Sequence, residues 1–266
     1  MIGNTIEHYL VLEKLGAVET STVYKARDLK LERVVLLKAI EVAENDADAL
    51  TSFQKEARAG ISLSHPNISS IFDVIDGIGG RYLIYEYLPG STLRERMQRA
   101  ATSGELIPVD RCVEYALAVA QGLAEAHRHG VIHRDVSADN IIVTPTHAIK
   151  ITNFGKARFG DGPTFAGGGS ITGSLSAFVP EKLQGSSIDH RGDIYSLCAL
   201  LFELITGERA FHSKNAAAFL HEVMHNPVPR MSDVRPGVSE NLQRIIEKGM
   251  AKRPEDRYPA MDLLIE

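Results

Sequence analysis

The stretch HRDVSADN at residues 133–140, followed by NFG at residues 153–155, decides how the rest of the chain is interpreted. Each motif of this kind is a weak signal when it stands alone. Working outward from the stretch, further polar positions follow one order along the chain: Lys38, Glu56, Pro180-Glu181, Asp193 and Arg257. An ordered series of this length is a strong signal of one fold and one chemistry.

The residues before position 88 carry the pattern of a small sheet. Alternating or β-branched runs predict strands at 9–15, 22–28, 33–40, 69–76 and 81–88. Apolar residues share one helical face over 46–63, which predicts a helix between the third strand and the fourth. This helix should end at Ser64-His65-Pro66-Asn67, because the residue before a proline avoids helical backbone.

After Pro89-Gly90 the chain becomes mostly helical. Apolar residues at three- and four-residue spacing predict helices at 109–129, 193–207, 215–225, 239–250 and from 259 to the end. The segment 193–207 is apolar on all sides, so we expect a buried central helix. The Gly- and Ser-rich stretch at 160–174 predicts a mobile surface loop. The chain is therefore expected to be α+β, with a small sheet-plus-helix lobe over 1–88 joined near 86–90 to a larger helical lobe over 89–266.

The composition limits the partners and the compartment. With 29 Lys and Arg against 34 Asp and Glu, the 266-residue chain has a formal charge of −5, so it lacks the basic excess that a nucleic-acid partner requires. Two cysteines cannot form a disulfide framework, which favours a reducing compartment. No apolar run is long enough to span a membrane. We expect a cytoplasmic protein, or the intracellular part of a longer, membrane-tethered protein, without nucleic-acid partners.

On these motifs the chain resembles the eukaryotic-like (Hanks-type) serine/threonine protein kinases of bacteria, as a degenerate, pseudokinase-like member. The similarity covers essentially the whole chain, from the first strand to RPEDRY at residues 253–258. The resemblance implies a two-lobed α+β protein-kinase fold, with an antiparallel sheet and one helix in the first lobe. It also implies a single domain over 1–266 whose last helix is cut short at Leu264-Ile265-Glu266.

The resemblance assigns roles to the residues that match the family. Lys38 would hold the ATP phosphates and pair with Glu56. Asp135 would act as the catalytic base that orients a substrate hydroxyl, and Asn140 would bind a metal ion. The implied nucleotide-binding set is Gly16, Val23, Leu36, Lys38, Glu56, Glu86, Leu88 and Ile142. The pair Glu181 and Arg257, together with Asp193, matches positions that brace the fold.

Departures from the family pattern surround the nucleotide. The phosphate-covering loop should read G-x-G-x-x-G, but only Gly16 remains, and Val18, Glu19 and Ser21 follow it. Side chains at these places restrict the approach of backbone amides to the phosphates, and Glu19 adds a negative charge. Leu36 replaces the alanine above the adenine, where a bulkier side chain predicts overpacking against the purine.

The metal and phosphate contacts are altered as well. Asn153 stands where the family has the aspartate of Asp-Phe-Gly, and Mg²⁺ prefers a carboxylate oxygen to a neutral amide. Asn140 and Asn153 therefore predict at most a weak site for Mg²⁺ or Mn²⁺. Ser137 replaces the catalytic-loop lysine that contacts the γ-phosphate, and a hydroxyl cannot supply that charge.

Two functions remain open on these residues. The leading interpretation is a pseudokinase that binds ATP weakly, transfers phosphate poorly or not at all, and acts through protein partners such as an active kinase or a phospho-reader. The alternative is a low-activity Ser/Thr protein kinase that moves the ATP γ-phosphate to protein hydroxyls. An engineered Asp→Asn change would explain Asn153 but none of the other departures. A small-molecule phosphotransferase is disfavoured, because Pro180-Glu181, Asp193 and Arg257 belong to kinases of protein substrates.

The hydroxyl-rich loop after residue 160 suggests regulation. Our hypothesis is that a partner kinase phosphorylates Thr172 and that the phosphate docks on Arg134, beside Asp135. The alternative is a Gly-rich loop whose hydroxyls have no such role.

Two histidine patterns resemble metal sites. The segment His221-Glu222-Val223-Met224-His225 fits the zinc-protease motif H-E-x-x-H, but no convincing third ligand follows, so we interpret it as a chance match on a surface helix. His127, His129 and His133 are close in sequence. His133 belongs to the HRD motif, and we expect the other two to cap the end of the preceding helix.

Overall fold

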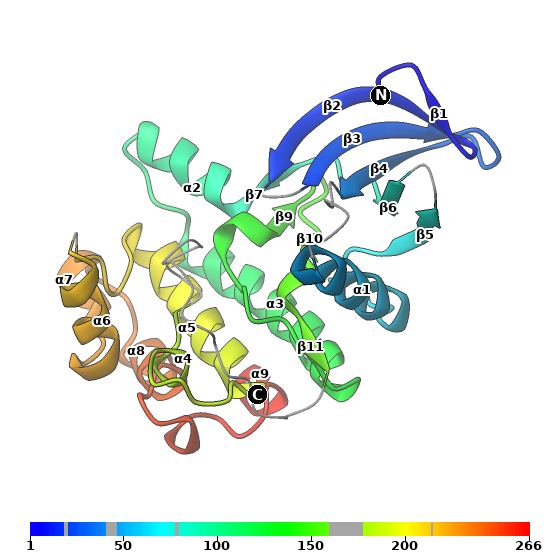
Figure 1. The fold of residues 1–266 in the computed structure, drawn as a ribbon. Helices are drawn as coiled ribbons and strands as arrows, with labels where there is room; N and C mark the ends of the chain where they lie inside the picture. The colour runs from blue at the N-terminus through cyan, green and yellow to red at the C-terminus, as the bar shows by residue number, and fades with distance from the viewer. Residues whose placement is uncertain (19–20, 41–46, 78–79, 160–177, 214) are drawn as a thin grey trace.

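Figure 1 shows the computed structural model of the chain, which describes residues 1–18, 21–40, 47–77, 80–159, 178–213 and 215–266. A sheet with one helix forms the first lobe, and helices form most of the second. The two-lobed α+β architecture expected from the sequence is therefore confirmed. None of the described helices is long and apolar enough to cross a bilayer.

The first lobe is built on a six-stranded antiparallel sheet of order β1-β2-β3-β4-β6-β5. Its strands are β1 (Thr5–Ile6), β2 (Tyr9–Val18), β3 (Ser21–Asp28), β4 (Arg33–Ile40), β5 (Ile71–Gly77) and β6 (Gly80–Glu86). Alternation along β4 puts Val35, Leu37 and Ala39 on one buried face. Only β1 has no counterpart in the sequence prediction, because two residues show no period.

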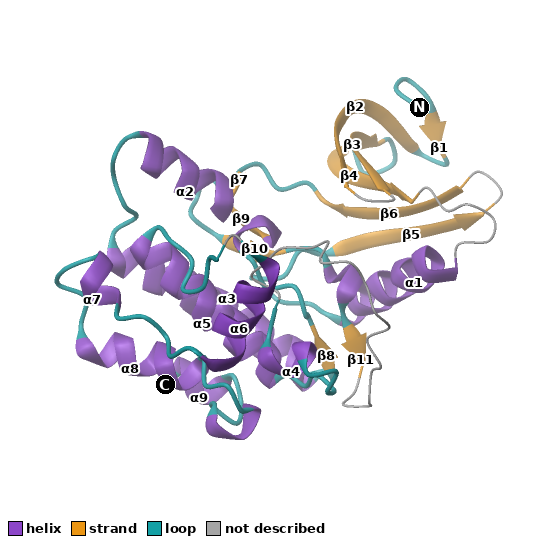
Figure 2. Cartoon of the chain, turned by 60° about the vertical axis from the view of Figure 1, so that its left-hand side comes forward, coloured by secondary structure: helices purple, strands orange, loops and turns teal. Residues whose placement is uncertain are grey.

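The helix α1 (Ala47–Ser62) packs against the opposite face of the sheet. Phe53 and Ala57 from α1 form a buried cluster with Leu83 and Tyr85 of β6, and Figure 2 shows α1 alongside β5 and β6. Ile84, between these two strand residues, belongs instead to the cluster on the other face. Side chains of β6 therefore contribute to a hydrophobic cluster on each face of the sheet, as the alternation of a strand requires.

The second lobe is mainly helical. Its helices are α2 (Leu93–Thr102), α3 (Val109–Arg128), α4 (Pro180–Leu183), α5 (Arg191–Thr206), α6 (Ala216–His225), α7 (Met231–Val234), α8 (Glu240–Gly249) and α9 (Asp262–Ile265). Short elements connect them: β7 (Ser91–Thr92), β8 (Val131–Ile132), β9 (Ile141–Val143), β10 (Ile149–Ile151), β11 (Arg158–Phe159) and the single turns η1 (Ala138–Asn140), η2 (Phe154–Lys156) and η4 (Pro254–Asp256). Most residues of α5 are buried, which confirms the expected central helix.

One expectation about this lobe is wrong, one is untested, and one helix was not predicted. The last helix begins at Asp262 rather than at 259, and the Pro259 carbonyl is bonded to His190 Nε2 at 2.8 Å instead of to a helical amide. The predicted surface loop at 160–174 lies outside the described residues. The helix α2 was missed, although Thr92 and Glu95 form a capping box at its start.

Both cysteines lie in the core of this lobe. Cys112 on α3 and Cys198 on α5 are buried, and burial raises the pKa of each thiol to about 12. The helices α5 and α8 approach closely at Gly249, where a Cβ atom would collide with Cys198 Sγ. The absence of a side chain at this position allows the two helices to pack together.

Candidate functional site

A cavity of about 250 Å³ lies where the two lobes meet. Its walls come from β3, β4, α1 and β6 on one side and from η1, β9 and residues 152–153 on the other. The lining residues are Ser21, Val23, Leu36, Lys38, Glu56, Ser69, Tyr85, Glu86, Leu88, Asp139, Asn140, Ile142, Thr152 and Asn153. Four of these residues are aliphatic and most of the others are polar, a combination that suits an organic ligand with an apolar part and a polar part.

The strongest electrostatic feature of the cavity is a buried ion pair. Lys38 Nζ on β4 lies 2.8 Å from Glu56 Oε2 and 3.0 Å from Glu56 Oε1 on α1. The Tyr85 hydroxyl donates to Oε1 of the same carboxylate. Burial, and then the neighbouring carboxylate, raises the pKa of Tyr85 well above its ordinary value of 10.0, so the phenol keeps its proton. Lys38 and Glu56, which the family resemblance pairs, are therefore in contact. Tyr85 is a third member of this hydrogen-bonded group, and it was not among the predicted site residues.

The predicted nucleotide-binding residues divide between the cavity and its surroundings. Seven of the eight line it: Val23, Leu36, Lys38, Glu56, Glu86, Leu88 and Ile142. Gly16 does not line it, and the place of its missing side chain is open space. Leu36 lines the cavity and also packs against the cluster of Phe53 and Leu83, so part of its added bulk would meet a ligand.

The strands β2 and β3 form a hairpin where the phosphate-covering loop is expected. Val18 pairs with Ser21 across it, and Ser21 is buried and lines the cavity. Glu19 and the side chain of Val18 lie outside the described residues, as does Thr172. The predicted effect of Glu19 on the phosphates and the docking of a phosphorylated loop therefore stay predictions.

One carboxylate on α5, that of Asp193, holds the backbone of residues 133–134 in place. Asp193 is fully buried, and it accepts hydrogen bonds from the backbone amides of His133 and Arg134, both at 2.8 Å. His127 Nε2 lies 2.8 Å from the same carboxylate. The expectation that His127 caps its helix is therefore wrong, because its ring is engaged with Asp193. His129 does contact a backbone carbonyl in the last turn of α3.

Asp135, the predicted base, is buried beside the cavity rather than in its lining. Asn140 Nδ2 donates to the Asp135 backbone oxygen at 2.8 Å. The Asp135 amide in turn lies 3.2 Å from His133 Nδ1. Hydrogen bonds within the loop therefore hold Asp135 in place next to the two lobes' junction.

Asn140 and Asn153 are hydrogen-bonded to each other. Asn153 Nδ2 donates to Asn140 Oδ1 at 3.1 Å, and Asn153 has left-handed backbone (φ 66°), which Asn adopts more readily than most residues. The oxygen that would face a metal ion thus already accepts a bond from a neutral amide. Mg²⁺ demands a near-octahedral shell of oxygens and is usually held through carboxylates, so this amide pair does not fit it.

Ser137 is fully enclosed and does not line the cavity. It stands where the resemblance implies a lysine in other family members, and a hydroxyl supplies no such charge. Its backbone is extended (φ −154°, ψ 162°) and its side chain is short, so the hydroxyl stays beneath the surface. Within the described part of the chain this hydroxyl has no hydrogen-bond partner. The position supplies neither a charge nor an accessible donor to the cavity.

Glu181 and Arg257 form a buried bidentate ion pair, with distances of 2.8 and 2.7 Å. The guanidinium also donates to the backbone oxygens of Ala251, Arg191 and Lys252 at 2.8, 3.1 and 3.2 Å. All five N–H groups of the guanidinium are therefore satisfied. The pair ties α4 to the start of α5 and to the segment after α8, in line with its predicted bracing role.

Four lining residues escaped the sequence prediction: Ser69, Tyr85, Asp139 and Thr152. Tyr85 could have been found, because it alternates with Leu83 on the α1-facing side of β6 and directly precedes Glu86. Asp139 lies within the HRDVSADN stretch itself. Ser69 and Thr152 carry no local signal and reach the cavity only through the fold.

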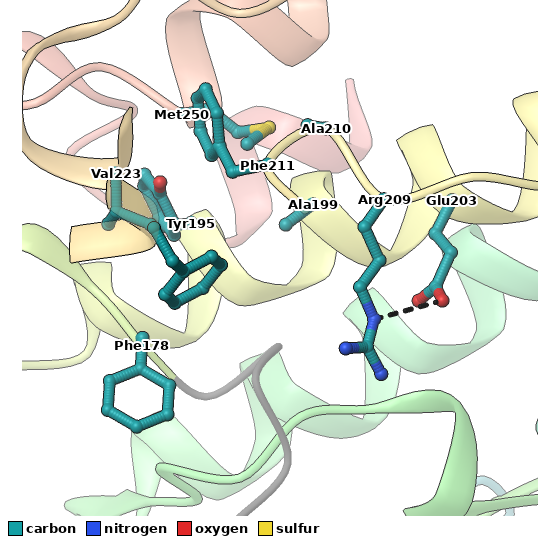
Figure 3. A pocket seen from close by; sticks show the side chains of 10 residues that line it. Phe178, Tyr195, Ala199, Glu203, Arg209, Ala210, Phe211, Val223 and Met250 are labelled. Carbon is teal, nitrogen blue, oxygen red and sulfur yellow. Dashed lines mark ion pairs between the residues drawn. The ribbon is translucent and has the colours of Figure 1, made fainter. Parts of the chain in front are cut away.

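A second and much smaller hollow lies beside α5. Figure 3 shows it among Phe178, Tyr195 and Phe211, with the ion pair between Arg209 and Glu203 (3.4 Å) at one side. Its volume of about 30 Å³ suits about two water molecules rather than an organic ligand. The cavity between the lobes, which seven of the eight predicted nucleotide-binding residues line, is the candidate site.

The H-E-x-x-H match on α6 does not form a metal centre. His221 and His225 are exposed, with ring centroids 4.8 Å apart, and Glu222 accepts a hydrogen bond from the Ser213 amide. Across the described residues, no group of three or more His, Cys, Asp or Glu is arranged to hold a metal ion.

Comparison with known proteins is consistent with this geometry. A family model described as protein kinase domain matches residues 9–266. The chain is 33% identical over 260 residues to a probable serine/threonine-protein kinase of Clostridium perfringens, covering 97% of this chain and 37% of that protein. It is 33% identical over 260 residues to PknB of Mycobacterium leprae (95% and 41%) and 33% identical over 253 residues to PknL of Mycobacterium bovis (94% and 62%), both serine/threonine-protein kinases. The chain thus spans between 37% and 62% of the length of these relatives.

Proposed function

Because the chain belongs to the protein kinase family, we propose that it is a pseudokinase: it binds ATP weakly, transfers phosphate poorly or not at all, and acts through contacts with protein partners. Kinases of this family use ATP with Mg²⁺ or Mn²⁺ and act on protein hydroxyls. The finer assignment rests on what the residues of this cavity can and cannot supply to that reaction.

The hydrogen bond between Asn140 and Asn153 carries the proposal. Phosphoryl transfer depends on positioned positive charge, because negative charge is spread over the phosphate oxygens in the transition state. Here the two positions that would hold the metal are neutral amides bonded to each other at 3.1 Å. Among the described residues that line the cavity, Lys38 is the single cation, and Glu56 already pairs with it. Transfer would thus lack most of the required charge.

The same cavity retains side chains that suit the adenine base of ATP. ATP, when bound, would bring a planar adenine and a polyphosphate. The aliphatic side chains of Val23, Leu88 and Ile142 suit the base, and Lys38 suits a phosphate oxygen. Leu36 and the lost glycines reduce the fit, so we expect weak binding without a metal ion.

Thermal unfolding with ATP, alone and with Mg²⁺ or Mn²⁺, followed by a radiolabel transfer assay, tests this function. We expect a small rise in Tm with ATP that neither metal enlarges, and no labelling of the chain or of an added protein substrate. A metal-dependent rise together with autophosphorylation would overturn the proposal and favour an active enzyme.

A slow Ser/Thr protein kinase is the second candidate. It is favoured by the intact Lys38–Glu56 ion pair and by the tight anchoring of the Asp135 loop on Asp193. The names of the relatives point the same way. Each of these contacts also holds the two lobes or the loop together, so each is equally consistent with a pseudokinase.

The Asn153→Asp variant should acquire a response to Mg²⁺ that the natural chain lacks. The new carboxylate would face the Asn140 oxygen, so two acceptors would meet until a cation bridges them. At a Mg²⁺ concentration about tenfold above its Kd, we expect Tm to rise by about 2–4 °C. Differential scanning calorimetry with and without Mg²⁺ measures this shift.

Asn153→Ala is the matched control, since it removes the same amide without adding charge and should show no response to Mg²⁺. An equal Tm rise in the natural chain would contradict the prediction. Adding Ser137→Lys to Asn153→Asp should not restore full transfer, because Leu36 and the loop around Ser21 remain unchanged.

Partner, compartment and regulation stay predictions. We place the protein in the cytoplasm, or on the intracellular side of a longer, membrane-tethered protein, with an active kinase or a phospho-reader as its partner. Phosphorylation of Thr172 and docking of the phosphate on Arg134 would couple the two proteins. Mass mapping after co-expression with an active kinase tests this step, and an unmodified 160–176 segment would exclude it.

A further inference from the structure

We propose that Tyr85 is a positioning residue, whose hydroxyl holds Glu56 and thereby α1 in the assembled arrangement when no ligand is bound. The proposal rests on the proposed function only in that it treats the cavity as the ligand site. It concerns what holds Glu56 and α1 in position beside the cavity, and it applies whether or not phosphate is transferred.

The first argument is the number of bonds on the Glu56 carboxylate. Glu56 is 3% exposed, so little water can reach it. Its Oε2 accepts from Lys38 Nζ at 2.8 Å, and its Oε1 accepts from Lys38 Nζ at 3.0 Å and from the Tyr85 hydroxyl. A buried carboxylate that loses a donor suffers a large penalty, because no water replaces the bond. The hydrogen bond from the Tyr85 hydroxyl therefore contributes substantially to keeping the Glu56 carboxylate buried.

The second argument is that the two donors come from different strands of one sheet. Lys38 lies on β4 and Tyr85 on β6, which are neighbours in the sheet and register Lys38 opposite Leu83. Glu56 is the acceptor for both, and it lies on α1. The carboxylate thus attaches the helix to two adjacent strands.

The third argument concerns what a ligand would change. A phosphate group that approaches Lys38 competes with Glu56 for the ammonium group. The Tyr85 hydroxyl lies on β6 and keeps its bond to Glu56 whatever Lys38 does, and its raised pKa keeps it a donor. The position of α1 should then be independent of the ligand, and a protein partner that contacts this lobe would meet a constant surface.

Apolar packing is the competing explanation for the position of α1. Phe53 and Ala57 pack with Leu83 and the ring of Tyr85, and α1 also contacts η2 from the second lobe. Tyr85→Phe separates the two explanations, because it keeps the ring and removes only the hydroxyl. Tyr87→Phe is the matched control: it makes the same change just beyond β6, where the ring lies 5.2 Å from Lys25 Nζ.

Hydrogen exchange with mass spectrometry, on the whole chain without nucleotide or metal, tests the proposal. In Tyr85→Phe we expect the amides of residues 50–62 to exchange about 10- to 100-fold faster than in the natural chain. The amides of β4 should be unchanged, which excludes a general loss of stability. Tyr87→Phe should exchange like the natural chain.

A second arm adds ATP at a concentration that raises Tm. We expect no change in α1 of the natural chain and still faster exchange of α1 in Tyr85→Phe, because the phosphate competes for Lys38, the remaining donor to Glu56. Exchange in Tyr85→Phe equal to that of the natural chain would overturn the proposal, as would an α1 that becomes protected in the natural chain only with ATP. Neither result bears on phosphate transfer, so this proposal and the proposed function fail separately.

Discussion

The Arg257→Ala variant is expected to lose about 3–5 kcal/mol of unfolding free energy, because it leaves the Glu181 carboxylate buried without its cation. Arg257 is enclosed, and all of its N–H groups are bonded, so the pair cannot be replaced by water. Urea unfolding followed by circular dichroism should show a lower midpoint with an unchanged m-value.

Arg257→Lys should recover at most about half of that loss, because an ammonium group has three donors and cannot form the planar double bond to the carboxylate. Arg253→Ala is the control on the same segment. Arg253 is 72% exposed and pairs with Glu255 at the surface, so its removal should leave the midpoint where it is. If the urea midpoint of Arg257→Ala equals that of the natural chain, the buried ion pair does not brace the lobe.

The Asp193→Ala variant should be destabilised to a similar extent, by about 3–5 kcal/mol, because two buried backbone amides and His127 lose their acceptor together. The loss should appear in the loop that carries Asp135 as well as in the global midpoint. Asp76→Ala, which removes one surface ion pair with Arg81 (2.9 Å, Asp76 50% exposed), is the control and should change little.

The charge on Asp193 also gives this prediction a pH dependence. Burial by itself raises the pKa of Asp193, but the hydrogen bond and charge of His127, together with His133 and the Arg134 amide, outweigh it and hold the pKa below its ordinary value of 3.8. A carboxyl whose pKa is lowered on folding stabilises the protein above its unfolded pKa and loses that contribution as the pH falls through the folded pKa. The free energy of unfolding of the natural chain should therefore exceed that of Asp193→Asn by a constant amount from about pH 7 to 5. This difference should shrink below pH 3.8. An advantage that stays constant down to pH 3 would contradict this assignment.

Local pattern was enough to predict the main elements. The strands β2 to β6 and the helices α1, α3 and α5 all follow from alternation or helical spacing in the sequence, because each buries one face or is enclosed on all sides. The pairing of Lys38 with Glu56 could be expected only through the family resemblance, since the two residues lie on different elements. Pattern therefore predicts elements, and a resemblance is needed to predict which of them meet.

The rest depends on contacts between distant parts of the chain. The side of β6 on which Tyr85 lies follows from alternation along the strand, but the hydrogen bond from its hydroxyl to Glu56 does not. Ser137 stands where the resemblance implies a lysine, and its side chain is enclosed and does not line the cavity. His127 stands at a helix end but is engaged by a carboxylate from another helix. For Tyr85 and His127 the neighbour of the side chain, and not its own segment, determines the contact.

The reactivity of the two buried thiols can report on the opening of the helical lobe. Cys112 Sγ donates to the Leu204 oxygen at 3.3 Å, and Cys198 lies against Gly249. With pKa values near 12 and no access to solvent, neither forms the thiolate that reacts with electrophilic reagents. Alkylation must therefore follow the separation of α3 or α5 from the core, and its rate measures how often the helical lobe opens. The natural sequence thus provides a kinetic probe of this lobe without any engineered label.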